Sequence, residues 1–516
     1  MLTNRFQRAQ SAGRPISPWL IGMAALLLVL SIVYVWPYFL DDAYIHLRYA
    51  LHLASGHGFA YNLGHPTYGS SAPLWVALLA GLSDLFGMPL NPILPKVVSV
   101  LAYAATYALV LDAVWRLARD WSNRSRILLW VAFSLALASP TLSRWLQDGM
   151  ETSLCTTLTV LAARWVLLEH LEPQSTRRKH PALLSVLQGV IFAAPGLIRI
   201  DLVPVSAALL VVPLWFRPSR AITIRFVSGV LVLGLWMWAL WSAFHAILPD
   251  TAVAKQGANL NPFWPIYGFW TCMVSSPLLA IIYAVVLPST PLIMWSVVRR
   301  QQGDVRLHPF AYSLPLVGTV LLGTLANQAI HGARYFLPQS MLAGLVLVLC
   351  ASRFQAVRQA TSGWVGAGLI VLALASAGQP ALAWFSTNYR PQPIQFTEHG
   401  RDVVSALPAG TRIFAADIGL LGWETRAWIL DACGLVNGRE IAKARDRTCA
   451  LFRVLGEPDV AIFRSEPPFD KPVVVTNCGT FGYYWHRDPI PVMVASKLGG
   501  DLLWYSFRPI RVSHGS

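Results

Sequence analysis

Long apolar segments recur along the first three quarters of the chain, separated by short polar stretches rich in arginine. An α-helix needs about 20 predominantly apolar residues to cross the hydrocarbon core of a bilayer. The pattern therefore predicts a polytopic α-helical membrane protein with about eleven transmembrane helices. We expect these helices near residues 19–40, 91–115, 127–142, 151–168, 182–198, 202–216, 223–245, 274–297, 310–330, 335–351 and 362–385.

The stretch between the first two long apolar segments has a different pattern. Residues 41–90 contain two amphipathic pieces, near 42–55 and 72–87, which we expect to lie along the membrane interface in the first outer loop. If 72–87 crossed the membrane instead, every later loop would change sides. The distribution of basic residues argues against that alternative.

Basic clusters fall on one side of the membrane in the eleven-helix topology, as expected for cytoplasmic loops. They are Arg116, Arg119, Arg124 and Arg126; Arg177, Arg178 and Lys179; Arg217, Arg220 and Arg225; Arg299, Arg300 and Arg306; and Arg353 and Arg358. The N-terminus is also basic, and no small-residue cleavage site follows its apolar run, which indicates an uncleaved signal anchor. We therefore expect a multi-pass protein of the bacterial inner (plasma) membrane, with a cytoplasmic N-terminus and a periplasmic C-terminal region.

Composition agrees with this class. Only 13% of residues are charged, against about 25% in average soluble chains. The net charge of +15 is accounted for mainly by the basic loops, so it does not indicate a nucleic-acid partner, and we find no nucleic-acid-binding module.

The polar C-terminal region predicts a second domain. We place the boundary so that residues 1–386 form the membrane domain and residues 387–516 form a small extracytoplasmic α/β domain, without a Walker motif or a dinucleotide fingerprint. Its cysteines are Cys433, Cys449 and Cys478, of which one pair could form a disulfide in the periplasm, leaving one thiol over. The expected strands lie near 411–416, 428–431, 459–463 and 502–507, and the expected helices near 398–407 and 439–455.

Two adjacent carboxylates, Asp41 and Asp42, stand where the first apolar segment ends. Acidic residues are costly at a membrane boundary and are therefore usually functional. One carboxylate could take the proton from an acceptor hydroxyl during glycosyl transfer, and the other could orient the acceptor or hold a divalent cation. A structural alternative is that Asp41 caps the helix beginning near Ala43.

Isolated cations on the outer side of the predicted topology point to an anionic ligand at the depth of a lipid-linked phosphate. The alternative is that each one reaches to the interface or pairs with a local carboxylate. These cations are Arg48, Lys96, Arg144, Arg199, Lys255 and Arg334.

Other polar positions in the outer segments each have two interpretations. His57 in a glycine turn could contact phosphate or sugar, or be a plain turn residue; Tyr68 could stack on a sugar or belong to the aromatic belt. Glu151 could line a cavity or favour its helix dipole. Asp201 could help to hold substrate, or simply pair with Arg199.

Together and in this order, these segments resemble the GT-C superfamily of membrane glycosyltransferases, and most closely the cell-wall arabinofuranosyltransferases that use polyprenyl-phosphate arabinose. The resemblance runs from about residue 38 to 463. Its motifs are Asp41 to Ala50, Gly56-His57-Gly58, Pro73-Leu74-Trp75, Gly149 to Thr152, Leu248 to Lys255, and Arg334 to Pro338. The chain departs from the family pattern at Tyr68-Gly69-Ser70-Ser71, at Arg199-Ile200-Asp201-Leu202, and at Asp250, where the family has Asn.

The resemblance implies a polyprenyl-phosphate sugar donor and an envelope glycan, lipid or protein acceptor, with the donor tail in the bilayer. It implies Asp41 as general base and Asp42 as orienting group or metal ligand, with no certain cofactor and a divalent cation as the one candidate. Residues implied to hold the donor phosphate are Arg48, Arg199, Lys255 and Arg334, and residues implied to line the substrate are His57, Tyr68, Glu151, Asp201 and Tyr335.

Two other function classes stay open. A transporter or flippase of a lipid-linked glycan would often show inverted repeats, and we find none in the sequence. A non-catalytic glycan-assembly partner would act through the C-terminal domain alone.

Overall fold

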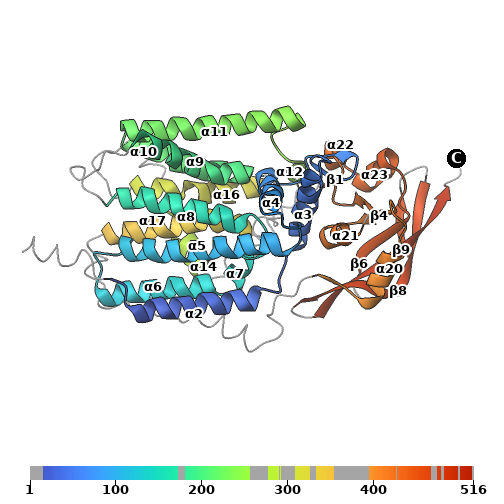
Figure 1. Ribbon diagram of the computed structural model, residues 1–516, viewed down its shortest axis with the longest axis horizontal. Helices are drawn as coiled ribbons and strands as arrows, with labels where there is room; N and C mark the ends of the chain where they lie inside the picture. Colours follow the sequence, from blue (N-terminus) through green and yellow to red (C-terminus); the bar gives the residue numbers. More distant parts are fainter. Residues whose placement is uncertain are drawn as a thin grey trace, which may run out of the picture.

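The computed structural model describes residues 15–171, 181–255, 277–289, 291, 308–325, 333–353, 394–425, 427–465, 473–477, 481–497 and 500–513. The described helices of the first part run side by side as a bundle (Figure 1). They are α2 (Pro18–Val35), α5 (Ile93–Leu117), α6 (Asn123–Ala138), α8 (Thr152–Glu169), α9 (Ala182–Ile198), α10 (Val203–Phe216), α11 (Arg220–Phe244), α14 (Pro277–Val286), α16 (Leu314–Leu325) and α17 (Leu337–Arg353).

Most of the apolar segments form helices where the sequence predicts them. Within the described residues, α2, α5 and α11 are long and apolar enough to cross a membrane, and α9, α10 and α17 are shorter apolar helices. The predicted helix near 362–385 lies outside the described residues. Helix α6 ends earlier than predicted because Ser139 and Pro140 start a new helix, α7 (Pro140–Trp145), whose first turn Ser139 caps.

Two short helices cover one end of the bundle, between it and the C-terminal strands (Figure 1). These are α3 (Asp41–Ala54) and α4 (Pro73–Phe86), joined through the small hairpin of β1 (Ala60–Asn62) and β2 (His65–Pro66). Each helix has 14 residues. That length is about 21 Å, which is too short to span a hydrocarbon core of about 30 Å and fits the predicted interfacial position.

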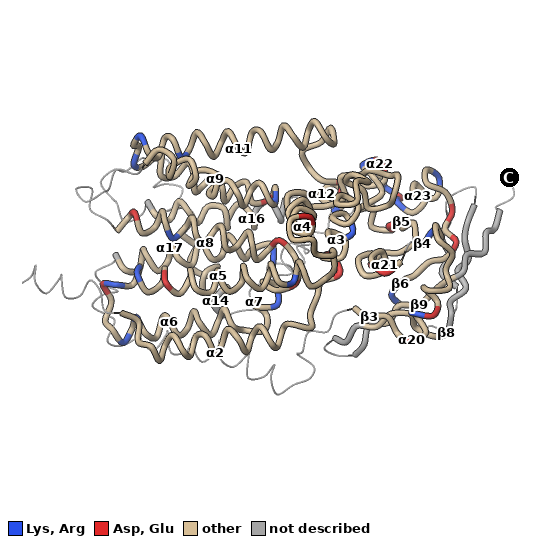
Figure 2. The backbone as a smooth tube through the Cα atoms, in the orientation of Figure 1, with Lys and Arg blue, Asp and Glu red and all other residues tan. Residues whose placement is uncertain are grey.

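Basic residues mark the opposite end of the bundle. Figure 2 shows Lys and Arg positions at the end farthest from the C-terminal strands. Arg116 near the end of α5, Arg126 in the first turn of α6 and Arg220 at the start of α11 follow this arrangement. The bundle therefore separates the clustered cations of the loops from the acidic pair at the start of α3.

The C-terminal unit is built on a mixed sheet whose strand order is β3-β8-β9-β6-β4-β5, with β7 paired to β8. Strands β6, β4 and β5 are parallel, and the other pairs are antiparallel. The strands are β3 (Gln395–Phe396), β4 (Arg412–Ala415), β5 (Trp428–Asp431), β6 (Val460–Ser465), β7 (Val473–Asn477), β8 (Phe481–Lys497) and β9 (Gly500–Ser513). The helices are α20 (Glu398–Ser405), α21 (Gly419–Glu424), α22 (Arg439–Lys443) and α23 (Arg447–Leu455).

The predicted strands near 411–416, 428–431 and 459–463 are present, but the long β8–β9 hairpin is predicted only around 502–507. The helix expected over 439–455 is interrupted, because the Asp446 side chain accepts from the Cys449 amide and starts α23. Cys449 is disulfide-bonded and Cys433 has a free thiol, whereas Cys478 lies outside the described residues. The predicted domain boundary at residue 386 also lies outside them.

Candidate active site

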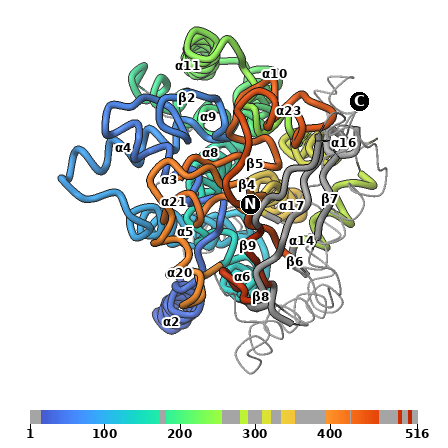
Figure 3. The backbone as a smooth tube through the Cα atoms, turned by 90° about the vertical axis from the view of Figure 1, so that its right-hand side faces the viewer, coloured from blue at the N-terminus to red at the C-terminus, as the bar shows by residue number. Residues whose placement is uncertain are grey.

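The start of α3 carries the acidic pair to the junction of the bundle and the C-terminal unit, where α21 packs against α3 (Figure 3). Leu40 is the residue before the helix, and Asp41 and Asp42 occupy its first turn. The capping alternative for Asp41 is therefore wrong. Two carboxylates in a first turn are favoured by the positive end of the helix dipole.

Two cavities meet at this junction. The smaller has a volume of about 240 Å³ and is lined by residues from the bundle end, among them His46, Glu151, Arg199, Asp201, Thr251 and Tyr335. The larger, of about 620 Å³, opens toward the C-terminal unit and is lined by Asp41, Asp417, Cys433 and Arg447, among others. The residues shared by both cavities are Asp42, Ile45, Lys255, Arg334 and Leu435.

Asp42 faces both cavities and pairs with Arg334, whose Nη2 donates to Oδ2 at 2.6 Å. Burial by itself would raise the pKa of Asp42, but Arg334 and Lys255 outweigh burial and lower it to about 2. Asp42 is therefore ionised at neutral pH. The buried Nη1 of Arg334 has no hydrogen-bond partner among the described residues, which leaves its two N–H groups for a ligand.

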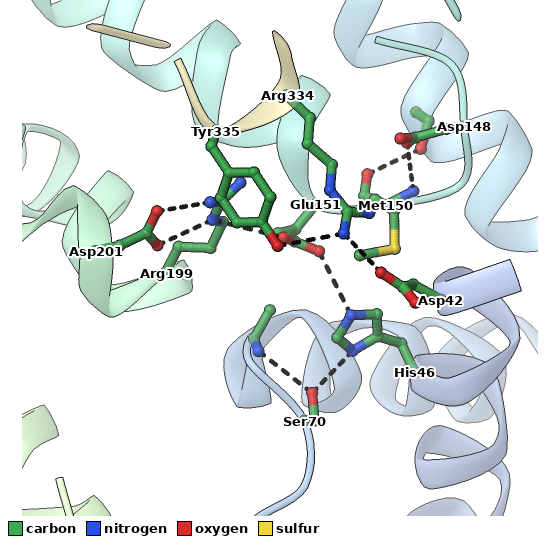
Figure 4. A network of polar contacts seen from close by, with 12 residues as sticks. Asp42, His46, Ser70, Asp148, Met150, Glu151, Arg199, Asp201, Arg334 and Tyr335 are labelled. Carbon is green, nitrogen blue, oxygen red and sulfur yellow. Dashed lines mark hydrogen bonds and ion pairs between the residues drawn. The ribbon is translucent and has the colours of Figure 1, made fainter. Parts of the chain in front are cut away.

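Three cations surround the ring of Tyr335. Arg199, Lys255 and Arg334 lie 5.0, 5.7 and 5.0 Å from its centroid. Its hydroxyl oxygen accepts from Lys255 Nζ at 3.1 Å and from Arg334 Nη2 at 3.3 Å (the Arg334 contact is drawn in Figure 4). Burial raises the pKa of Tyr335, but Arg334 and Lys255 lower it to about 8. An oxygen at this position therefore sits in a strongly positive field.

A chain of polar side chains, all buried except Asp201, runs along the smaller cavity from Ser70 to Asp201 (Figure 4). The Nδ1 of His46 lies 2.8 Å from Ser70 Oγ, and its Nε2 lies 3.7 Å from Glu151. The other oxygen of Glu151 is 3.6 Å from Arg199. Arg199 in turn donates to both oxygens of Asp201, at 3.0 and 2.6 Å. The ion pair between Arg199 and Asp201 that the sequence suggested is therefore present. The guanidinium of Arg199 lines the cavity while its charge is neutralised by these neighbouring carboxylates.

Asp41 is held in a different way, by backbone amides of the C-terminal unit. Its Oδ2 accepts from the Gly419 amide and its Oδ1 from the Leu420 amide, each at 2.8 Å. Burial raises the pKa of Asp41 to about 7, although the two amides act against this rise. Asp41 thus lies on the larger cavity with a fixed orientation.

Several predicted site residues line neither of the two cavities. Arg48 donates to the carbonyls of Tyr61 and Ala427, at 2.8 and 2.9 Å, and to that of Gly422, so its N–H groups are used to join α3 to the C-terminal unit. The sequence-based assignment of Arg48 to the phosphate is therefore corrected. A guanidinium bound by three carbonyls has little left for an anion.

His57 and Tyr68 also lie outside these cavities. His57 is exposed in its turn, beside His52 at a ring distance of 6.3 Å. Tyr68 stacks on Phe244 at 4.4 Å and donates to the Ile247 carbonyl at 3.2 Å. Tyr68 thus supports the segment before α12 (Asp250–Lys255) instead of lining the substrate.

Two further cations of the predicted outer set have local partners. Lys96 donates to the carbonyls of Val35, Tyr38 and Gln147 at 3.1, 2.7 and 2.6 Å. Arg144 lies over the Trp145 ring at 4.7 Å. Neither lines the two cavities, so only half of the predicted set converges there.

Sequence analysis missed two buried residues of the site. His46 stands four residues after Asp42, so the two share one helix face, and that spacing was a usable signal. Asp148 precedes the Gly149–Thr152 motif and is fully buried; burial raises the pKa of Asp148 to about 7, while Arg334 opposes that rise. Asp250, which stands where the resembled family has Asn, forms an ion pair with Arg439 of α22 at 3.1 Å.

The structure does not support the predicted role of Asp42 as a metal ligand, because the described residues offer no further ligands beside it. Within the described residues, no group of three or more His, Cys, Asp or Glu side chains is placed to hold a metal ion. Asp42 is instead matched by Arg334 and Lys255, and neighbouring cations disfavour a bound divalent ion.

Comparison with known proteins gives a fold. No protein-family model matches the chain, and no curated protein matches it. The crystal structure of ArnT from Cupriavidus metallidurans bound to undecaprenyl phosphate is similar, with a TM-score of 0.51, 10% sequence identity, and coverage of 96% of this chain and 98% of that one. At this identity the likeness concerns the fold, and it covers both the bundle and the C-terminal unit. The chain therefore shares its fold with this ArnT structure, which agrees with the fold that the resemblance to the GT-C superfamily implies.

Proposed function

We propose that this protein is an inverting glycosyltransferase that moves a sugar from a polyprenyl-phosphate donor to an acceptor hydroxyl on the outer face of the bacterial inner membrane. The observation that carries the proposal is the junction of the two cavities, where Arg334 and Lys255 converge beside Asp42, and Asp41 stands on the larger cavity. The acceptor is an envelope glycan, lipid or protein.

The donor phosphate occupies the positive field around Tyr335. Lys255 and Arg334 already donate to an oxygen there, and Arg334 Nη1 is unpartnered among the described residues. Arg199 lies 5.0 Å from the centroid of the same ring, but its own charge is paired with Asp201 and Glu151, so Lys255 and Arg334 are the main phosphate ligands in the proposal. Undecaprenyl phosphate, bound by the similar ArnT, belongs to the same chemical class. Countering the charge of the departing phosphate is the main electrostatic contribution to such a transfer.

The sugar fits the smaller cavity. Its volume of about 240 Å³ is below the roughly 300–1,000 Å³ of drug-sized sites, which suits one sugar ring. Glu151, Asp201 and Thr251 offer oxygen atoms to sugar hydroxyls on its wall. The three carboxylates that line this cavity, Asp42, Glu151 and Asp201, are matched in number by the cations Arg199, Lys255 and Arg334, so the proposal favours a neutral sugar.

The acceptor hydroxyl approaches through the larger cavity. Its oxygen attacks the anomeric carbon, its proton passes to Asp41, and the bond between the anomeric carbon and the phosphate oxygen breaks with its electron pair going to the phosphate. The attack inverts the configuration at the anomeric carbon. A base with a pKa of about 7 suits this task at neutral pH.

The membrane orientation is part of the proposal. The basic end of the bundle faces the cytoplasm, and the acidic pair and the C-terminal unit face the periplasm. The donor phosphate then lies at the outer headgroup level, with its prenyl chain in the bilayer.

The test is transfer by the full chain in lipid nanodiscs, with a panel of radiolabelled polyprenyl-phosphate sugars and an envelope extract as acceptor. We expect label to move into a glycosidic bond, and free polyprenyl phosphate to be released in equal amount. Movement of the intact donor across liposome membranes without bond formation would instead show a flippase. Mass analysis of envelope glycans from cells with and without the protein would identify the sugar.

A further inference from the structure

The C-terminal unit touches the candidate base directly. The amides of Gly419 and Leu420 are both 2.8 Å from the oxygens of Asp41. Each carboxylate oxygen has a second acceptor site. One side of the carboxylate is thus bound to α21, and the other is free to face the larger cavity, which Asp41 lines.

Further hydrogen bonds between buried groups join the same two parts. The hydroxyl of Tyr61 donates to the Ile418 carbonyl at 2.5 Å. The side chain of Asn62 exchanges two hydrogen bonds of 2.9 Å with the backbone of Ile429. Arg48 donates to the Ala427 carbonyl at 2.9 Å. These contacts fix the position of α21 relative to the start of α3.

The packing at this contact leaves no room for a side chain. A Cβ on Gly419 would overlap the backbone carbonyl of Asp41, and a Cβ on Gly422 would overlap the Tyr61 hydroxyl. Glycine at these positions lets the backbone of α21 come close enough for its amides to reach the carboxylate.

We propose that the C-terminal unit completes the active site, with the Gly419 and Leu420 amides as positioning groups that aim the Asp41 carboxylate into the larger cavity. This inference rests on the proposed function, because it assigns the amides a role only if Asp41 is the base. The membrane unit alone is then inactive, even where it folds.

The same contact determines how Asp41 responds to pH. The acidic groups facing it are Asp42 on α3 and Asp417 beside α21, and the phenols facing it are Tyr44 and Tyr61. Both carboxylates disfavour a second negative charge, whereas the two amides favour it. Loss of the amide contact therefore makes Asp41 harder to ionise.

The first test is the substitution Gly419→Ala in the full chain, with Gly81→Ala as a matched control. Gly81 in α4 has open space where a Cβ would stand. In the pH profile of kcat/KM, the acid limb is the rise in activity as Asp41 loses its proton. We expect the midpoint of this limb to move up by about one pH unit in Gly419→Ala, the order of shift that a change in hydrogen bonding produces. Gly81→Ala should keep the wild-type limb. A lower activity with an unmoved limb would overturn the positioning role.

A milder variant, Tyr61→Phe, keeps the ring and removes only the bond to Ile418. We expect a smaller shift of the limb in the same direction, so the proposal stays testable if Gly419→Ala does not fold. An unmoved limb in a folded Tyr61→Phe protein, together with misfolding of Gly419→Ala, would count against positioning.

The second test does not depend on activity. Amide hydrogen exchange over residues 418–424 is measured in wild type, Asp41→Ala and Asp42→Ala. We expect at least tenfold faster exchange in Asp41→Ala alone, because the amides of Gly419 and Leu420 both lose their acceptor. Equal exchange in all three proteins would refute the contact. If exchange is faster in Asp41→Ala but the wild-type protein transfers no sugar, the contact stands, whereas the proposed function and the positioning role that rests on it are refuted.

Discussion

The region around Asp42 and the region around Asp41 are built from different kinds of contact, although the two residues are neighbours in the chain. Asp42 pairs with a side chain, Arg334, and its pKa is about 2. Asp41 pairs with backbone amides of the C-terminal unit, and its pKa is about 7. A charged partner keeps a carboxylate permanently ionised, whereas neutral amides orient it and leave it able to take a proton.

We expect the strongest loss of activity from replacing Asp41. Asp41→Asn keeps the shape of the side chain and removes the base, so we expect kcat to fall by about 10²–10⁴-fold with little change in protein yield. The measurement is single-turnover transfer from the radiolabelled donor. Asp402→Asn on exposed α20 is the matched control. Near-normal turnover in Asp41→Asn would falsify the base assignment.

Arg334→Ala removes the charged partner of Asp42. We expect the donor KM to rise about tenfold to a hundredfold, because a hydrogen bond to a charged group is worth about 1.5–3 kcal/mol. The comparison is with Arg116→Ala, which removes an exposed pair with Asp112 at the far end of α5. A donor KM that does not change in Arg334→Ala would place the phosphate elsewhere.

The pH dependence of kcat/KM compares the two sides in one measurement. Asp41 gains its basic form as pH rises through about 7. Tyr335 loses its proton as pH rises through about 8, and the phenolate then repels the donor phosphate. We expect a bell-shaped profile with its optimum between these values, and Tyr335→Phe should remove the alkaline limb only. An alkaline limb that persists in Tyr335→Phe would assign it to another group.

The smallest expected effect concerns the second link between the two units. Arg439→Ala leaves the buried carboxylate of Asp250 without its ion-pair partner, and we expect it to lower the free energy of unfolding by about 1–3 kcal/mol. The acid limb of kcat/KM should stay in place, since this pair does not touch Asp41. The measurement is thermal unfolding in detergent, with Arg401→Ala on the exposed face of α20 as the control. A moved limb would show that the two links are coupled.

Much of the local structure was predictable from sequence. Apolar segments such as Ile93–Leu117 and Arg220–Phe244 form helices because a helix satisfies its own backbone hydrogen bonds in an apolar surrounding, and their length and apolar composition suit a bilayer. The interfacial α3 and α4 follow from amphipathic pattern, and the parallel strands β4, β5 and β6 from short apolar runs. The β8–β9 hairpin was missed because its long strands interrupt the apolar pattern with charge and proline, as at Arg487 and Pro491.

Hydropathy and charge are local properties of the chain, so they are enough to predict the membrane class and to mark the acidic pair and the cations Arg199, Lys255 and Arg334 as candidates. Which of the cations converge depends on long-range contacts, because Arg48 and Arg334 look alike along the chain. Arg48 donates to three backbone carbonyls, whereas Arg334 donates to the carboxylate of Asp42 and the hydroxyl of Tyr335. Tertiary structure also brought Gly419, 378 residues away, against Asp41. Every residue except proline has a backbone amide, so no sequence pattern could have predicted the contact between the Gly419 amide and Asp41.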